Sequence, residues 1–106
     1  MGKGRNKYIG RNYVKECIRE YGIHLKTPHK SRLLPYQEQA VRNAFEYTET
    51  LLNGTERLKM IDMVLIKQTH NINGAAMALH FSESTCYNWH KEFIDCVAEY
   101  LGLTTL

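Results

Sequence analysis

The chain has 106 residues, of which 43% are hydrophobic and 24% charged, and its formal net charge is +3. These values are ordinary for one globular domain with a single core. No apolar run approaches the roughly 20 residues that cross a bilayer, and no apolar segment follows the basic N-terminus, which argues against a membrane span and a secretory signal. Three widely spaced cysteines are expected to stay reduced, as in a cytoplasmic protein.

Residues 1–12 form a basic segment with three glycines and no helical pattern, which predicts a flexible arm. The first 32 residues carry nine Lys or Arg against two Glu, whereas the rest of the chain carries five against nine Asp or Glu. A basic end on a mildly acidic body indicates a polyanion partner. The arm residues expected to contact phosphate are Lys3, Arg5, Lys7 and Arg11.

A first helix is predicted directly after this arm, within a single helical domain that covers residues 13–106. Its apolar face is formed by residues at helical spacing, namely Tyr13, Val14, Cys17, Ile18 and Tyr21. Asn12 is expected to cap the start of this helix and Gly22 to end it. Thr27 precedes Pro28 and is therefore disfavoured from helix, so a connecting segment follows.

Two further helices are predicted in the middle of the chain. Pro35 suits a first helical turn, because its missing N–H needs no partner there, and "NG" at Asn53 and Gly54 stops that helix. Thr55 is expected to cap the next one, whose apolar residues go most of the way round it. A helix with that pattern is usually buried on most sides, so we expect it to be central.

The last predicted pair of helices lies within "INGAAMALHFSESTCYNWHKEF" and has the spacing of a helix-turn-helix at about residues 72–101. Ala76 is small enough for a close helix crossing, and Leu79 faces the core one turn later. His80 occupies the turn position where glycine is common, which requires a positive φ. Phe81 is expected to plug the corner, and the hydroxyl of Ser82 to accept the N–H of Thr85 as an N-cap. The fold class is therefore all-α, with about five helices.

The helix that begins after Ser82 divides into two faces. An apolar stripe points inward and comprises Cys86, Trp89, Phe93, Val97 and Tyr100 or Leu101. The other face has hydrogen-bonding and charged side chains near the helix start, where recognition helices meet base edges and phosphates. The predicted DNA contacts are Glu83, Ser84, Thr85, Tyr87, Asn88 and Lys91. Among them Asn88 can bond adenine bidentately, whereas Lys91 and Tyr87 can hold phosphate.

The C-terminal thirty residues also resemble a known family in their alanine pair, apolar turn, S-x-x-T segment, H-K-x-F-I segment and final A-E-x-L-G-L. The matching residues are Ala75, Ala76, Phe81, Ser82, Thr85, His90, Lys91, Phe93, Ile94, Ala98, Glu99, Leu101, Gly102 and Leu103. This end is similar to phage late-gene transcriptional regulators of the ArpU/RinA type, which carry a helix-turn-helix like sigma-factor region four. The resemblance implies control of phage or prophage late genes in the cytoplasm of a bacterial host.

Enzymatic and metal chemistry find no support in the sequence. His70, His80 and His90 stand ten apart, without the tight ligand pairs that zinc sites use. We find no nucleophile elbow, no phosphate-binding glycine loop after a strand and no paired catalytic carboxylates. We therefore expect no catalysis, no metal and no cofactor.

The sequence thus favours a DNA-binding regulator whose partners are double-stranded DNA and host RNA polymerase, acting as a homo-oligomer without membrane contact. One helix-turn-helix seldom suffices alone, which is the reason to expect an oligomer or a polymerase contact. Two alternatives remain open. The first is a phage terminase small subunit, which recognises DNA for packaging and forms rings. The second is a protein-interaction adaptor that docks through Met60, Met63 and Met77 without reading DNA.

Overall fold

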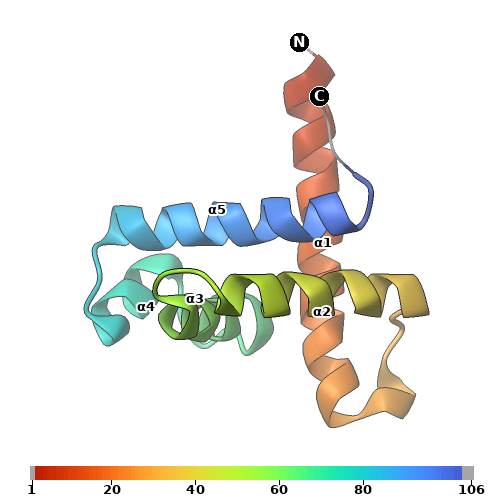
Figure 1. The fold of residues 1–106 in the computed structure, drawn as a ribbon, viewed down its shortest axis with the longest axis horizontal. Coiled ribbons are helices and arrows are strands. Elements are labelled where there is room, and N and C mark those ends of the chain that lie inside the picture. Colours follow the sequence, from red (N-terminus) through yellow and green to blue (C-terminus); the bar gives the residue numbers. More distant parts are fainter. Residues whose placement is uncertain (1, 104–106) are drawn as a thin grey trace.

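The computed structural model describes residues 2–103, with side chains from residue 10 onward, and Figure 1 shows its helices. The elements in chain order are α1 (Gly2–Lys26), η1 (Pro28–Lys30), α2 (Pro35–Glu49), α3 (Gly54–Ile61), η2 (Asp62–Ile66), α4 (Ile72–Leu79) and α5 (Glu83–Tyr100). The prediction of an all-α fold with about five helices is confirmed, since residues 2–103 contain five α-helices and no strand.

α1 differs from its predicted bounds at both ends. It begins at Gly2 and ends at Lys26, so the segment predicted as a non-helical arm belongs to the helix, and neither Asn12 nor Gly22 marks a boundary. Extending a helix costs far less than nucleating one, so a basic segment attached to a packed helix can continue it. Gly22 stays inside the helix because it is buried against the side chain of Ile66, where a larger residue would not fit.

α2 begins at Pro35 as predicted. The extended Leu34 precedes it, and the Leu34 N–H donates to Oε1 of Gln37 at 2.9 Å, which satisfies a free donor at the helix start. α3 begins earlier than predicted, after Asn53 in the left-handed conformation (φ 59°), and Thr55 is not its cap. Gly54 is buried against the Glu49 carbonyl oxygen, 2.5 Å from where a Cβ would lie, so the chain turns tightly there.

α3 passes without interruption into η2, a π-helical turn in which the Lys67 N–H donates to the Asp62 carbonyl at 2.8 Å. Met60, Ile61 and Leu65 on this continuous segment are buried. The segment contacts α1, α2, α4 and α5, which confirms its predicted central position.

The core lies where α1 crosses behind α2 and α5, which run side by side in Figure 1. Its buried members are Val14, Cys17, Ile18, Tyr21, Val41, Ala44, Met60, Ile61, Leu65, Ala75, Ala76, Cys86, Trp89, Phe93, Ile94 and Val97. Tyr13, predicted inward, lies instead at the α1–α2 edge, 38% exposed, where its hydroxyl accepts from the amide of Gln37.

Within residues 2–103, no helix combines the length and the apolar character needed to cross a membrane.

Candidate nucleic-acid interface

α4 and α5 are joined by a three-residue turn, His80–Ser82. α4 starts at a side-chain cap, because Oδ1 of Asn71 accepts the Gly74 N–H at 2.7 Å. It ends at His80, which has φ 64° and ψ 41°, the left-handed conformation predicted for this residue. The Phe81 N–H then donates to the Ala76 carbonyl at 3.0 Å, so the turn closes back on α4.

Ser82 caps α5 as predicted. Its hydroxyl oxygen accepts the Thr85 N–H at 3.2 Å and its hydroxyl donates to Oγ1 of Thr85 at 2.8 Å. Thr85 is half-buried and engaged in this cap, so its hydroxyl is less free for an outside partner than the sequence suggested. The turn and the start of α5 are therefore held by local hydrogen bonds at both ends.

The inner side of the helix pair is packed as predicted. Ala76 is 2% exposed and Cys86 is fully buried. Phe81 packs edge-on against Trp89, with ring centroids 4.7 Å apart and ring planes at 63°. This corner fixes the direction in which α5 leaves the turn.

The outer side of α5 is exposed along the predicted reading face. Glu83, Ser84, Tyr87, Asn88 and Lys91 are all exposed. The Lys91 ammonium lies 3.4 Å from Oδ2 of Asp95, one turn further along the helix, in an exposed pair that is worth little and leaves the lysine free to move.

A groove of about 670 Å³ runs between this face and α1. Tyr87, Asn88 and Lys91 line it from α5, and Arg11 and Lys15 line it from α1. The predicted arm residue Arg11 therefore lies beside the predicted reading residues. Lys15 was not predicted as a site residue, because its position in the groove depends on how α1 and α5 pack against each other.

Among the described side chains, none that lines the groove is acidic. The remaining walls of the groove come from η2, the loop after it and the start of α4. The polar residues there are Gln68 and Asn71, and the apolar ones are Val64, Leu65 and Ile72. The helix α1 also includes the other predicted arm residues, Lys3, Arg5 and Lys7. Their side chains precede residue 10 and so lie outside the part of the chain whose side chains the structure describes.

His90 also lines this groove and is 7% exposed. Burial, followed by the positive charges of Lys15 and Arg11, lowers the pKa of His90 to about 4. The imidazole is therefore neutral at pH 7. Sequence reasoning missed this residue, although Cys86, His90, Ile94 and Val97 also form a buried row at helical spacing.

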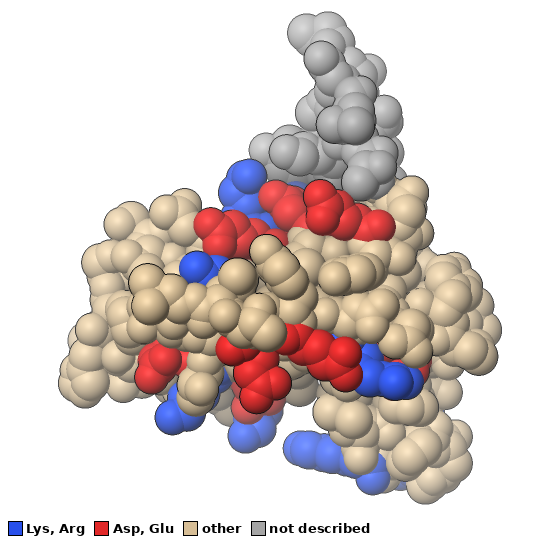
Figure 2. Space-filling view, viewed as in Figure 1, with Lys and Arg blue, Asp and Glu red and all other residues tan. Residues whose placement is uncertain are grey.

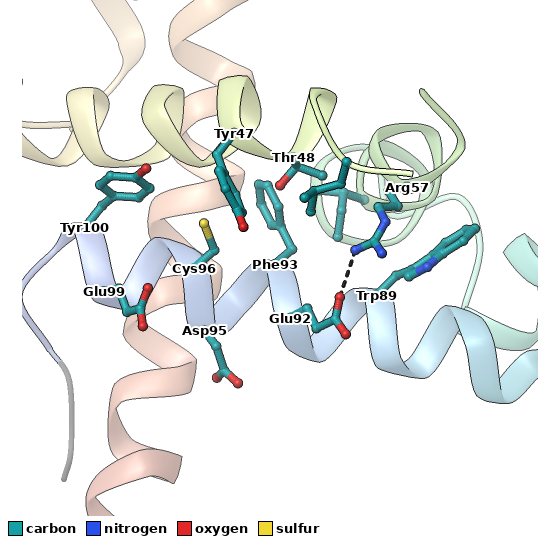
Figure 3. Close-up of a pocket in the computed structure, with 12 residues that line it drawn as sticks. Tyr47, Thr48, Arg57, Trp89, Glu92, Phe93, Asp95, Cys96, Glu99 and Tyr100 are labelled. Atoms are coloured by element: carbon teal, nitrogen blue, oxygen red, sulfur yellow. Dashed lines mark hydrogen bonds and ion pairs between the residues drawn. The ribbon is translucent and has the colours of Figure 1, made fainter. Parts of the chain in front are cut away.

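The opposite side of α5 faces α2 and differs in charge. Figure 3 shows a second groove, where Glu92, Asp95 and Glu99 follow α5. Arg57 donates to Glu92 at 2.8 Å, and its guanidinium carbon lies 5.6 Å from the centroid of the Trp89 ring. In Figure 2, which shows this face, acidic side chains lie above and below an uncharged strip. The second groove therefore has acidic lining residues, and one of them, Asp95, also contacts Lys91 of the first groove.

Cys96 lies in this second groove, and burial together with the charge of Glu99 raises the pKa of its thiol to about 11. All three cysteines are free. Among residues 10–103, no three His, Cys, Asp or Glu side chains come together as a metal site would require.

Searches with the whole chain against protein-family models, characterised proteins and solved structures return no match.

Proposed function

We propose that the protein binds duplex DNA and regulates transcription, with α4 and α5 acting as a helix-turn-helix. The observation that carries this proposal is the left-handed, side-chain-capped turn at His80–Ser82, followed by a helix whose first half exposes polar side chains on one face. DNA-binding units of this class place that second helix in the major groove.

In this arrangement α5 enters the major groove from its N-terminal end. Asn88 has the amide geometry for a bidentate bond to adenine, and Glu83 can accept from a cytosine amino group. Tyr87 and Lys91 can hold phosphate on either side of the bases. The charges predicted to assist from the N-terminal segment are those of Lys3, Arg5, Lys7 and Arg11, which would add salt-dependent affinity.

The resemblance of the C-terminal thirty residues to phage regulators of the ArpU/RinA type supports late-gene control as the biological role. Under this proposal the protein binds its operator as a homo-oligomer or alongside host RNA polymerase. The adaptor alternative loses support from burial, because Met60 is fully buried whereas Met77 is 72% exposed, so the methionines named for it do not form one accessible surface.

The test is selection of bound duplexes from a random pool, followed by affinity measurements on selected and scrambled sequences over a range of salt concentrations. We expect a preference for the selected sequence and a negative dependence of log K on log salt. Asn88→Ala should cost about 1–3 kcal/mol on the selected site and relax the preference at one position. Asn43→Ala on α2 is the matched control and should leave binding unchanged.

Equal affinity for both duplexes together with no salt dependence would contradict the proposal. The mass of the protein in solution, measured with and without duplex, separates the regulator from a terminase small subunit. A ring of many copies supports the packaging alternative, and a monomer or dimer on the duplex supports the regulator.

A further inference from the structure

We propose that Arg11 and Lys15 of α1, together with Lys91 of α5, clamp one backbone phosphate of the bound DNA at the end of the reading face. This inference rests on the proposed function and deepens it, because it names the part of the partner that the groove holds. It gives the part of α1 that packs against α5 a direct role in DNA binding.

The first support is the placement of the cations. Arg11 and Lys15 are four residues apart, about 6 Å along α1, and both line the groove whose opposite wall carries Asn88 and Lys91. Asn88 and Lys91 are in turn neighbours on one face of α5. A phosphate between the two helices would therefore lie within a helical turn of the side chain proposed to read adenine.

The second support is that the positive charges of Arg11 and Lys15 are not neutralised by a described side chain, whereas Lys91 makes only the exposed pair with Asp95. Arg19, Arg42 and Arg57 each contact a glutamate. Among the described side chains no carboxylate lies within ion-pair distance of Arg11 or Lys15, and the sequence outside them contains no Asp or Glu. Like charges four residues apart on a helix repel each other, so an anion bound between them relieves that repulsion.

The buried His90 lines the same groove as Arg11 and Lys15. Burial, and then the positive charges of Lys15 and Arg11, lower the pKa of its ring, as expected if both charges lie close to it. Glu92, Asp95 and Glu99 line the second groove of α5, although Asp95 also contacts Lys91 and Glu92 contacts Arg57. A polyanion is therefore attracted more strongly to the groove between α1 and α5 than to the second groove.

The experiment compares the salt dependence of duplex binding for the wild-type protein, Arg11→Gln/Lys15→Gln and the charge-matched control Lys26→Gln/Lys30→Gln. Lys26 and Lys30 are exposed and lie at the far end of α1 and in η1. Each neutralised phosphate contact adds about 0.9 to the slope of log K against log salt. Because the clamp holds one phosphate, we expect the Arg11/Lys15 variant to lose up to about 0.9 in slope, the control to lose much less, and both to keep the wild-type sequence preference.

The outcomes are separable. An unchanged slope in an Arg11/Lys15 variant whose circular dichroism and melting match the wild type overturns the clamp. The proposed function is judged separately, by the sequence preference of the wild-type protein and by Asn88→Ala. A titration with inorganic phosphate, monitored through the NMR signals of the His90 ring, tests whether a small anion is the ligand. Saturation at micromolar phosphate with no further response to duplex would also overturn the clamp.

Discussion

Gly10 and Gly22 lie on the same helix in opposite environments, and replacing each by alanine separates helix propensity from packing. A Cβ at Gly10 would meet no atom within 4 Å, whereas one at Gly22 would overlap the Cγ2 methyl of Ile66. Alanine is favoured over glycine inside a helix by about 0.8–1.0 kcal/mol, a gain common to both variants. Overpacking a core site costs about 1–3 kcal/mol. Gly10→Ala should therefore raise the free energy of unfolding, and the free energy of unfolding of Gly22→Ala should be lower than that of Gly10→Ala by about 1–3 kcal/mol.

Urea unfolding followed by circular dichroism at 222 nm measures both variants against the wild type. The comparison is valid if the slope of the free energy against urea stays the same, because a changed slope would signal a changed unfolded state. A double-mutant cycle of Gly22→Ala with Ile66→Ala tests the cause, since Ile66→Ala removes the Cγ2 methyl that the new Cβ would overlap. Equal free energies of unfolding for Gly10→Ala and Gly22→Ala would refute the packing argument.

Three further predictions concern α5 and its turn. Trp89→Ala should destabilise the protein by about 3–5 kcal/mol in urea unfolding, because the ring is 95% buried against Phe81, whereas truncating the exposed Tyr87 should change stability by less than about 0.5 kcal/mol. His80→Gly should raise the melting temperature, because glycine adopts the left-handed conformation without steric cost; an unchanged or lower value would count against strain at this turn. His90 should titrate near pH 4 by NMR. Its pKa in the folded state is below its ordinary value of 6.5, so the stability it contributes is present at neutral pH and is lost as the pH falls from 6.5 to about 4. Titration at the ordinary pKa would show that the ring is not buried.

The local features of the helix pair were predictable because they depend on a few neighbouring residues. The positive φ of His80 and the capping bond of Ser82 follow from side-chain chemistry within one turn. The inward positions of Ala76, Cys86 and Trp89 follow from helical spacing. The identity of this pair as a helix-turn-helix stays a prediction.

The failures have a different physical origin, because they depend on close approaches between segments, most of them far apart in the chain. Glycine ends many helices, but Gly22 lies inside one, where the side chain of Ile66 packs onto it. The turn before α3 uses Asn53 and not the expected Thr55, because the chain at Gly54 approaches the end of α2 too closely for a side chain. The groove that brings Lys15 to α5 needs the crossing of two helices, which no pattern within either helix contains.

The crossing of α1 and α5 has a consequence for folding. Arg11 and Lys91 are 80 residues apart in the sequence, so the groove between them exists only after the chain between α1 and α5 has been closed into a long loop. Contacts of such long sequence separation are slow to form. A chain whose N-terminal helix has detached would keep the local bonds of the α4–α5 turn but lose the groove, and His90 would become accessible to water. Hydrogen exchange of α1 and the titration of His90 should therefore report the same opening event, which would make the groove between α1 and α5 a property of the completely folded chain.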